Sequence, residues 1–287
     1  MQTIGYERPE TLAEAVAILD EMGQDARLLA GGTDLLIGLR QGELHPAVLV
    51  DTKRIPELRP AIREAAGKLS IGADTVMTDI AADARVRRSF PALAEAAATV
   101  GAVQIRNRAT LAGNICNASP AADTAPPLLA YAGQVVAYGP AGRRRIPIDE
   151  FFSGPGQTIL ARGEIVAAIE LPVPAGPAGS AFGRLTRRRG ADLASVSVAA
   201  AIDSSGRARL GFGAVGPRPL LAADDSGVLA DPATEPAERA RLLATLAMTT
   251  NPISDVRASR EYRMSMVLVL GQRVLGAAIT RRAEGWR

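Results

Sequence analysis

Two glycine-bearing segments contain residue types that could hold a phosphate group without a charged side chain. The first consists of Ala30, Gly31, Gly32, Thr33, Asp34 and Leu35, and the second consists of Thr110, Leu111, Ala112, Gly113 and Asn114. Each offers small side chains, one hydroxyl and unhindered backbone N–H groups, and a row of N–H groups in a tight turn forms an anion-binding concavity. Because the two segments lie about 80 residues apart, we expect one ligand with two phosphates between them.

Neither segment has the spacing of a common nucleotide-binding motif. The first lacks both the G-x-G-x-x-G pattern of dinucleotide-binding folds and the G-x-x-x-x-G-K-[ST] pattern of P-loops. By itself, a Gly-Gly-Thr sequence after a strand is more often a plain turn. Asp34 would repel a phosphate, so we expect its side chain to point away or to cap a helix.

A polar segment surrounds the second loop. Residues 103–127 show little periodicity, so we expect a long irregular loop, and such loops in compact domains are usually functional or disordered. Its short polar side chains could bond their own backbone in Asx-turns, and Asp123 could cap a helix that starts at Ala125. These side chains are Asn107, Asn114, Asn117 and Asp123.

The composition excludes several classes of site. The 287 residues include one cysteine, Cys116, and one histidine, His45, which excludes an intramolecular disulfide and an iron–sulfur cluster held by this chain alone and argues against a zinc site. A net charge of +3 without a dense Lys/Arg run does not indicate nucleic-acid binding. The sequence shows no signal peptide and no apolar run of about 18 residues, so we expect a cytoplasmic protein without a membrane span.

Helices and strands that alternate along the chain would position these loops. Thr11 and Glu14 have capping-box spacing at the start of a predicted helix over residues 11–22, and a strand over 27–29 leads into the first loop. The other predicted elements of this half are a short helix or turn at 35–39, a helix at 91–100, and strands at 47–50, 68–72, 134–138, 144–148 and 165–171.

A proline- and glycine-rich segment at residues 172–179 indicates a domain boundary, because three prolines and two glycines in eight residues fit neither helix nor sheet. We place one domain at 1–175, with subdomains of about 1–55 and 56–175, and a second domain at 176–287. The second has predicted strands at 182–188, 195–202 and 207–215, a turn at 203–206, and helices at 235–249 and 258–280. The predicted fold class is α+β.

The polar segment resembles the FAD-binding signature of the flavoprotein (medium) subunits of the molybdenum hydroxylase family. That family includes the medium chain of carbon monoxide dehydrogenase and the flavin domain of xanthine dehydrogenase. The signature covers residues 104–127, QIRNRATLAGNICNASPAADTAPP. Residues 29–35 are similar to the family's other flavin motif, and residues 151–158 (FFSGPGQT) and 255–263 (DVRASREYR) resemble two further segments.

The resemblance implies roles for residues in both loops. The backbone of the first loop and the Thr33 hydroxyl would meet the FAD pyrophosphate, and the second loop would form the opposite wall. Asp123 would accept hydrogen bonds from ribityl or ribose hydroxyls, as a carboxylate can. The implied FAD-binding residues are Leu29, Ala30, Gly31, Gly32, Thr33, Asp34, Gly101, Thr110, Ala112, Gly113, Asn114, Cys116, Asp123, Leu160 and Arg184.

Three of these residues are implied near the flavin ring, and two positions depart from the family pattern. Cys116 would lie beside the isoalloxazine, with a buried small hydrophobe as the alternative interpretation, and Leu160 and Arg184 would close over the ring. Arg184 stands where many members carry lysine. Ala112 stands where a second glycine is usual, and alanine would cost about 1 kcal/mol if the position required a positive φ.

The resemblance implies a two-part FAD-binding domain of the vanillyl-alcohol-oxidase-like type and a C-terminal domain of a three-stranded antiparallel sheet with a helical bundle. It implies an electron-transfer subunit without catalytic or metal-ligating residues, which passes electrons from [2Fe–2S] clusters to NAD, a quinone or dioxygen. The implied partners are a large molybdopterin-binding subunit and a small subunit with two [2Fe–2S] clusters, in a dimer of heterotrimers. A self-contained FAD-dependent oxidoreductase and a flavin-free scaffold subunit are the alternatives, and the substrate stays open.

Overall fold

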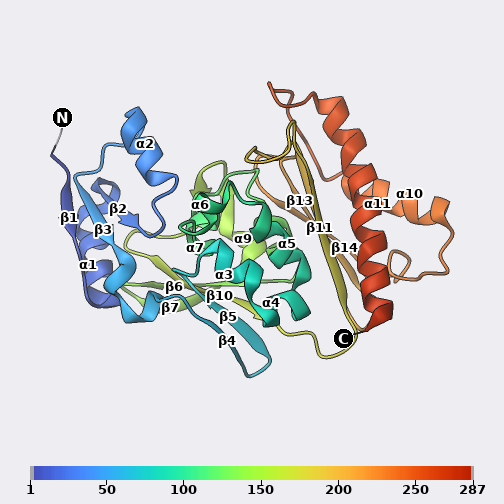
Figure 1. The fold of residues 1–287 in the computed structure, drawn as a ribbon, viewed down its shortest axis with the longest axis horizontal. Helices are drawn as coiled ribbons and strands as arrows, with labels where there is room; N and C mark the ends of the chain where they lie inside the picture. Colours follow the sequence, from blue (N-terminus) through green and yellow to red (C-terminus); the bar gives the residue numbers. More distant parts are fainter. Residues whose placement is uncertain (1–2, 286–287) are drawn as a thin grey trace.

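The first part of the chain builds a small parallel sheet connected by two helices. In the computed structural model, which describes residues 3–285, its strands lie in the order β1-β3-β2. The chain passes between them through α1 and α2 (Figure 1). The bounds are β1 Gly5–Glu7, α1 Leu12–Met22, β2 Ala26–Leu29, α2 Leu35–Gln41 and β3 Val48–Asp51.

Helix α1 forms where the sequence predicts a helix. Thr11 Oγ1 accepts a hydrogen bond from Glu14 N at 3.2 Å, and Gly23, with φ 56, follows the last residue of the helix. Because its apolar residues recur at helical spacing, they share one face and are buried. These residues are Leu12, Ala15, Val16 and Leu19. The predicted cap and apolar face are therefore confirmed.

The middle part contains a five-stranded antiparallel sheet in the order β4-β5-β10-β6-β7. Short helices and a small β8–β9 hairpin surround it (Figure 1). The strands are β4 Ile62–Ala65, β5 Lys68–Gly72, β6 Gln134–Gly139, β7 Gly142–Pro147, β8 Phe152–Gly154, β9 Gln157–Thr158 and β10 Ile165–Pro172. Its first helices are η2 Thr52–Arg54, η3 Pro56–Leu58, α3 Met77–Ala82, α4 Ala84–Ser89 and α5 Pro91–Thr99, and α9 Ile148–Phe151 comes later; η1 Gly23–Asp25 belongs to the first part, between α1 and β2.

The prediction of an irregular loop at residues 103–127 is wrong in part. The structure forms three short helices there: α6 Val103–Arg106, α7 Leu111–Cys116 and α8, which continues to residue 130 as Ala125–Ala130. Helices of four to six residues are too short to show a 3.6-residue periodicity. Two prolines in the first turn of α8 are compatible with a helix start, because that turn needs no N–H donor.

The last part contains a four-stranded antiparallel sheet, so the predicted three strands are too few. Its order is β11-β12-β13-β14, with β11 Gly179–Leu185, β12 Val196–Ile202, β13 Ala208–Gly213 and β14 Leu220–Asp224. The missed strand, β14, is short, rich in leucine and alanine, and follows two prolines, so it lacks β-branched residues. Two helices follow, α10 Pro236–Ala247 and α11 Arg260–Glu284.

This four-stranded sheet lies between α11 on one face and α5 of the middle part on the other (Figure 1), and α8 of the middle part also packs against the sheet. Gly211 of β13 shows how close the second contact is, because a Cβ atom there would lie 2.0 Å from the carbonyl oxygen of Pro126 in α8. The buried apolar residues form two clusters, one within residues 12–171 and one between the sheet and the C-terminal helices. Strand β11 therefore places its residues directly beside the middle part.

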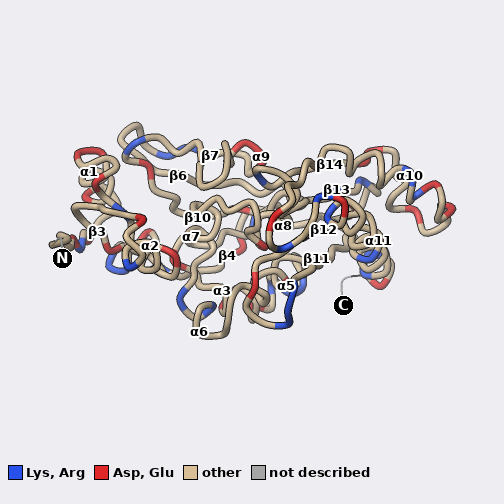
Figure 2. The backbone as a smooth tube through the Cα atoms, turned by 90° about the horizontal axis from the view of Figure 1, so that it is seen from above, with Lys and Arg blue, Asp and Glu red and all other residues tan. Residues whose placement is uncertain are grey.

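Charges of both signs are spread along the chain. Lysine and arginine alternate with aspartate and glutamate over the backbone (Figure 2). Among residues 3–285, no helix has the length and apolar character needed to cross a membrane.

Candidate cofactor site

The first glycine loop begins where the parallel strand β2 ends. It continues from Ala30 to Asp34, and α2 begins at Leu35. Gly32 has φ 74, a left-handed conformation that glycine adopts without strain. The backbone N–H groups of residues 31–35 have no hydrogen-bond acceptor within the described part of the chain. The loop therefore presents a row of unused donors, as expected for the approach to a helix N-terminus.

Two side chains of this loop are free of internal bonds. Asp34 occupies the N-cap position of α2, but its exposed carboxylate makes no capping bond. The expectation that it caps the helix is therefore wrong. The Thr33 hydroxyl forms no hydrogen bond to any residue between 3 and 285, so it stays available to a ligand.

The second loop is anchored by its own helix cap and by a neighbouring segment. Thr110 Oγ1 accepts a hydrogen bond from Gly113 N at 3.0 Å, which caps α7. Leu111 N donates to the carbonyl oxygen of Thr75 at 3.1 Å, and Met77 N donates to that of Ala109 at 2.9 Å. These bonds fix the position of the loop. One lone pair of the Thr110 hydroxyl oxygen already accepts the N–H of Gly113.

The first glycine loop meets the backbone that leads into the second loop. A Cβ atom at Gly31 would lie 2.1 Å from the carbonyl oxygen of Arg108 and 3.1 Å from the Cα atom of Ala109. Real Cβ atoms do not approach a carbonyl oxygen so closely, so only glycine allows this contact. The unused N–H groups of the first loop consequently lie next to the residues that lead into Thr110.

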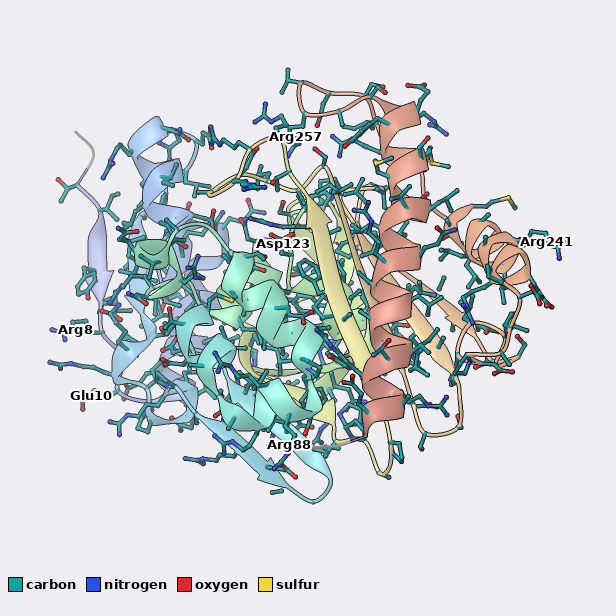
Figure 3. The ribbon with its side chains drawn as sticks, turned by 45° about the vertical axis from the view of Figure 1, so that its right-hand side comes forward. Arg8, Glu10, Arg88, Asp123, Arg241 and Arg257 are labelled. Carbon is teal, nitrogen blue, oxygen red and sulfur yellow. The ribbon has the colours of Figure 1, made fainter. Side chains whose placement is uncertain are left out.

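Asp123 and Arg184 form an ion pair between the middle part and β11. Arg184 Nη1 donates to Asp123 Oδ2 at 2.5 Å, and Asp123 lies beside β11 in Figure 3. The same guanidinium also donates to the carbonyl oxygens of Asp192 at 3.3 Å and Gly190 at 3.5 Å. The pair is enclosed, since the exposed fractions of the two side chains are 7% for Asp123 and 13% for Arg184.

The second carboxylate oxygen of Asp123 has no partner. Oδ1 is buried and accepts no hydrogen bond in the described chain, whereas Oδ2 receives Arg184 and, at 3.5 Å, Thr99 Oγ1. Burial raises the pKa of Asp123 to about 6, although Arg184 opposes the shift. A buried acceptor without a donor is costly, so this oxygen is suited to a hydroxyl from a ligand.

The polar side chains around the second loop bond to other segments rather than to their own turns. Asn114 Oδ1 accepts from Thr124 Oγ1 at 2.6 Å and so ties α7 to α8. Asn107 Oδ1 accepts from Thr78 Oγ1 at 2.6 Å. The alternative of Asx-turns is therefore wrong for these two asparagines. The alternative of an Asp123 cap on α8 is also wrong, because Thr124 is the N-cap residue and α8 has no side-chain cap.

The strain considered at Ala112 is absent. Ala112 lies inside α7 and is buried, and its φ is not positive. Gly101 does have a positive φ, 50, and a Cβ atom there would lie 2.9 Å from the Ile105 side chain. Alanine at position 112 therefore has no backbone cost, whereas glycine at position 101 is required by the turn before α6.

Cys116 and Leu160 lie against the first apolar cluster. Burial raises the pKa of the Cys116 thiol to about 12, so the thiol stays protonated at neutral pH. Leu160 N donates to Thr158 Oγ1 at 3.4 Å. Cys116 is the last residue of α7, which begins in the second loop, whereas no hydrogen bond connects Leu160 to either loop or to Asp123 within residues 3–285.

Sequence reasoning missed a polar cluster behind the first loop. Thr52 Oγ1 donates to Asp74 Oδ1 at 3.0 Å, and Lys53 Nζ lies 3.5 Å from the carbonyl oxygen of Leu29. Burial raises the pKa of Asp74 to about 6. A signal was present, because Thr52 and Lys53 come just after Asp51, the residue that follows the strand predicted at 47–50, and parallel strands present such residues at one edge. Thr99, whose hydroxyl donates to Asp123 Oδ2, had no such signal in the sequence.

The arrangement matches one type of ligand. The described residues contain no group of three or more His, Cys, Asp or Glu side chains that could hold a metal ion. They do contain a row of free N–H donors beside a second anchored loop, and a buried carboxylate with one unused oxygen. The first feature is suited to a diphosphate and the second to a hydroxyl-bearing chain.

Two protein-family models match the chain in succession. The model described as the FAD binding domain in molybdopterin dehydrogenase matches residues 2–174. The model described as the CO dehydrogenase flavoprotein C-terminal domain matches residues 181–278.

Similar proteins and structures cover almost the whole chain. The carbon monoxide dehydrogenase medium chain of Hydrogenophaga pseudoflava is 36% identical over 283 residues, 97% of this chain and 98% of that protein. The xanthine dehydrogenase FAD-binding subunit of Escherichia coli O157:H7 is 35% identical over 287 residues, 96% and 95% of the two chains. A solved carbon monoxide dehydrogenase of H. pseudoflava has a TM-score of 0.89 at 34% identity, covering 97% and 98%. Quinoline 2-oxidoreductase of Pseudomonas putida 86 has a TM-score of 0.85 at 30% identity, covering 97% of each chain.

Proposed function

Because the chain belongs to the FAD-binding medium subunits of the molybdenum hydroxylase family, we propose that it is the electron-transfer subunit of a molybdenum-containing dehydrogenase. In this role it binds FAD, receives electrons from [2Fe–2S] clusters of a partner and delivers them to an external acceptor. The observation that carries the proposal is the row of free N–H groups at residues 31–35, which lies against the backbone just before the second loop through the contact of Gly31 with Arg108.

The FAD pyrophosphate is the group that these donors suit. The N–H groups of the first loop and the Thr33 hydroxyl hold its oxygens, and no positive side chain is needed because the donors themselves supply the positive potential. Thr110, Gly113 and Asn114 supply the opposite wall. Gly31 and Gly32 keep Cβ atoms out of the space where the backbones and the ligand approach.

Asp123 is the second feature of the site that suits FAD. Its unused Oδ1 accepts a hydroxyl hydrogen from the ribityl or ribose part of FAD, while Arg184 holds Oδ2. This gives the buried carboxylate the donor that it otherwise lacks. Arg184 comes from β11, so the last part of the chain completes a site built mainly by the first two.

The protein's contribution to the reaction is positional and electrostatic. When bound, FAD supplies an acceptor that takes electrons singly and gives them up as a pair. The chain binds it at the pyrophosphate, orients it through Asp123 and places the guanidinium of Arg184 at the edge of the site. Cys116 keeps its proton at neutral pH, because burial raises its pKa to about 12, and so it takes no part as a thiolate.

The family membership also guides the proposal for partners and domains. We place a large molybdopterin-binding subunit and a small subunit with two [2Fe–2S] clusters beside this chain, in a dimer of heterotrimers located in the cytoplasm. The similar proteins carry the names of dehydrogenase chains or subunits, which supports such an assembly. We keep the domain boundary at residue 175, with a FAD-binding domain of the vanillyl-alcohol-oxidase-like type before it and subdomains that divide near residue 55.

Absorbance spectroscopy and co-purification test the proposal. The purified chain is expected to absorb near 450 nm, and a tagged chain expressed with its neighbouring coding regions is expected to bring down subunits that contain iron and molybdenum. Absence of flavin after incubation with excess FAD would favour a flavin-free scaffold. A flavin-loaded single chain with full dehydrogenase activity would favour the self-contained oxidoreductase. Both results would contradict the proposal.

A further inference from the structure

A cavity lies toward the start of β11, away from Asp123. Its volume is about 760 Å³, and its walls come from α4, the turn after α8, the proline-rich segment at 172–179, the β12–β13 hairpin and the end of α11. Ser180 of β11 lines it, whereas Arg184 of the same strand reaches Asp123. Four residues of strand separate these positions by about 13 Å. The cavity is therefore distinct from the proposed FAD site.

The lining of the cavity contains more arginines than carboxylates. Five arginines line it, together with the two carboxylates of Asp203 and Glu284. The carboxylate of Asp203 already accepts hydrogen bonds from Ser205 N, Ser205 Oγ and Arg207 N within its own turn. The five arginines are Arg87, Arg88, Arg207, Arg209 and Arg281. An anion entering the cavity therefore meets more guanidinium groups than lining carboxylates, while carboxylates outside the lining (Glu64, Asp225 and Glu95) pair with Arg88, Arg207 and Arg281.

Arg209 is the guanidinium most available to a ligand. Arg207 pairs with Asp225 at 2.5 Å, and Arg281 pairs with Glu95 at 2.5 Å. Arg209 is only half-exposed, yet its side chain has no hydrogen bond or ion pair with any residue between 3 and 285. A partly desolvated guanidinium without an acceptor is suited to a bidentate contact with a carboxylate or phosphate.

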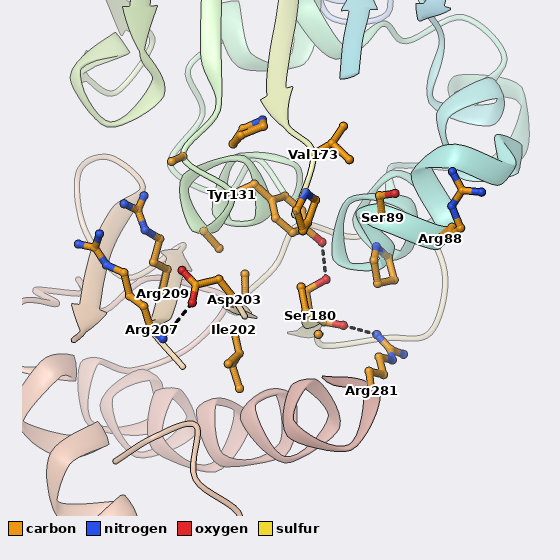
Figure 4. Close-up of a pocket in the computed structure, with 18 of the residues that line it drawn as sticks. Arg88, Ser89, Tyr131, Val173, Ser180, Ile202, Asp203, Arg207, Arg209 and Arg281 are labelled. Atoms are coloured by element: carbon orange, nitrogen blue, oxygen red, sulfur yellow. Dashed lines mark hydrogen bonds between the residues drawn. The ribbon is translucent and has the colours of Figure 1, made fainter. Parts of the chain in front are cut away.

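A pair of hydroxyls supplies a further donor between the arginines. Tyr131 and Ser180 lie 2.5 Å apart, oxygen to oxygen, and Ala92 N donates to Tyr131 at 3.0 Å. Two hydroxyls carry two protons, and their mutual bond uses one. Figure 4 shows the pair between Arg207 and Arg209 on one side of the cavity and Arg281 on the other. The remaining proton is available to an acceptor in the cavity, and burial raises the pKa of Tyr131, so the phenol does not lose it.

The remaining walls are apolar and stiff. Pro91, Pro172, Val173, Pro174 and Ile202 line the cavity, and proline fixes the backbone around it. A concave site of this size, with apolar walls and a few polar groups, is typical of small-molecule sites, which range from roughly 300 to 1,000 Å³. We propose that this cavity binds a small organic anion, with an apolar ring body against the prolines and a carboxylate or phosphate on Arg209 and the Tyr131–Ser180 hydroxyls.

Titration calorimetry on the whole protein with FAD bound tests this site. The probes are naphthalene-2-carboxylate, 2-naphthyl phosphate and the uncharged naphthalene-2-carboxamide. We expect at least one anion to bind with 1:1 stoichiometry and the amide to bind about tenfold more weakly or not at all. The anion that binds more tightly shows whether the site takes a carboxylate or a phosphate.

Variants locate the site. Arg209→Gln is expected to weaken anion binding by about tenfold, and Arg209→Lys by less. The matched control is Arg241→Gln on α10 (Figure 3), an exposed arginine without a side-chain partner among residues 3–285, which is expected to leave binding unchanged. The absorbance at 450 nm monitors the flavin separately in every sample.

Three results would overturn the proposal. They are no binding of either anion at millimolar concentration, equal binding of the anions and the amide, and anion binding that Arg209→Gln leaves unchanged in a folded variant. Binding of polyglutamate but of neither naphthalene anion would indicate an acidic polypeptide as the occupant and would also contradict a small-molecule site.

Discussion

Arg184 on β11 reaches across to Asp123 and donates to its Oδ2 at 2.5 Å. The two residues lie in segments that match different family models, residues 2–174 and residues 181–278. Their pairing makes the C-terminal part of the chain a direct contributor to the proposed FAD site. The unused Oδ1 of Asp123 and the burial of both side chains give this contact measurable consequences.

The ionisation of Asp123 is expected to make stability depend on pH in a defined interval. Its pKa is about 6 in the folded chain, against an ordinary value of 3.8. The folded state therefore holds the proton more tightly, so the contribution of Asp123 to the free energy of unfolding should fall as the pH rises from about 4 to about 6, by at most about 3 kcal/mol. Urea unfolding of the FAD-free chain at several pH values measures this slope. Asp123→Asn cannot titrate and should show a flatter slope, and an unchanged slope would exclude Asp123 as the cause.

Removal of Arg184 is expected to cost more than removal of an exposed arginine nearby. Arg184→Gln leaves a buried carboxylate without its charged partner, which should lower the free energy of unfolding by about 3 kcal/mol at pH 7. The loss should shrink near pH 4, where Asp123 is protonated. Arg189→Gln is the control, because Arg189 is exposed and its side chain forms no hydrogen bond or ion pair with any residue between 3 and 285, and such surface substitutions change stability by less than about 0.5 kcal/mol. Equal losses for both variants would show that burial of the Asp123–Arg184 pair is unimportant.

A methyl group at Gly31 is expected to separate the two loops. In Gly31→Ala the new Cβ atom would lie 2.1 Å from the Arg108 carbonyl oxygen, so the backbones must move apart and flavin should be lost. The ratio of absorbance at 450 nm to that at 280 nm measures the loss, and circular dichroism reports whether the variant folds. Gly276→Ala, where nothing lies within 4 Å of the added Cβ, should keep its flavin. A folded Gly31→Ala variant with a normal flavin content would contradict the proposed clamp.

Loss of the Thr110 cap is expected to affect both stability and flavin affinity. Thr110→Ala removes the acceptor for Gly113 N, which should cost about 1 kcal/mol and loosen the start of α7. Thr11→Ala removes the same kind of cap from α1 and should cost a similar amount. Flavin titration of the two FAD-free variants separates the effects, because only Thr110→Ala should raise the dissociation constant. A parallel rise in both variants would mean that flavin affinity follows global stability alone.

Local patterns were enough to predict many of the elements. Lys68–Gly72 was predicted with the bounds that the structure shows, and the helix that starts at Pro91 ends one residue earlier than predicted. Both have signals within a few residues, such as a proline that suits the first helical turn. The same reasoning failed at Leu220–Asp224 and over residues 103–127, where the elements are too short or too poor in β-branched residues to show a pattern.

Contacts between segments that are distant in the sequence could not be predicted from the sequence. The resemblance implied that Asp123 and Arg184 each meet FAD, but nothing local indicates that they pair with each other across 61 positions. The contact between Gly31 and Arg108 likewise depends on how the middle part packs against the first sheet. Position 112 shows the opposite error, because comparison with the usual glycine suggested a strain that a residue inside α7 does not have.

The contact between Gly31 and Arg108 also sets an order of events during synthesis. The first loop leaves the ribosome long before Arg108 is made, and Arg184 on β11 follows later still. A growing chain therefore has the first wall of the proposed clamp without the second, and then both walls without the ion pair that holds Asp123. If FAD binds as proposed, a chain that stops before β11 would have both walls of the clamp but would lack Arg184, the partner of Asp123 Oδ2.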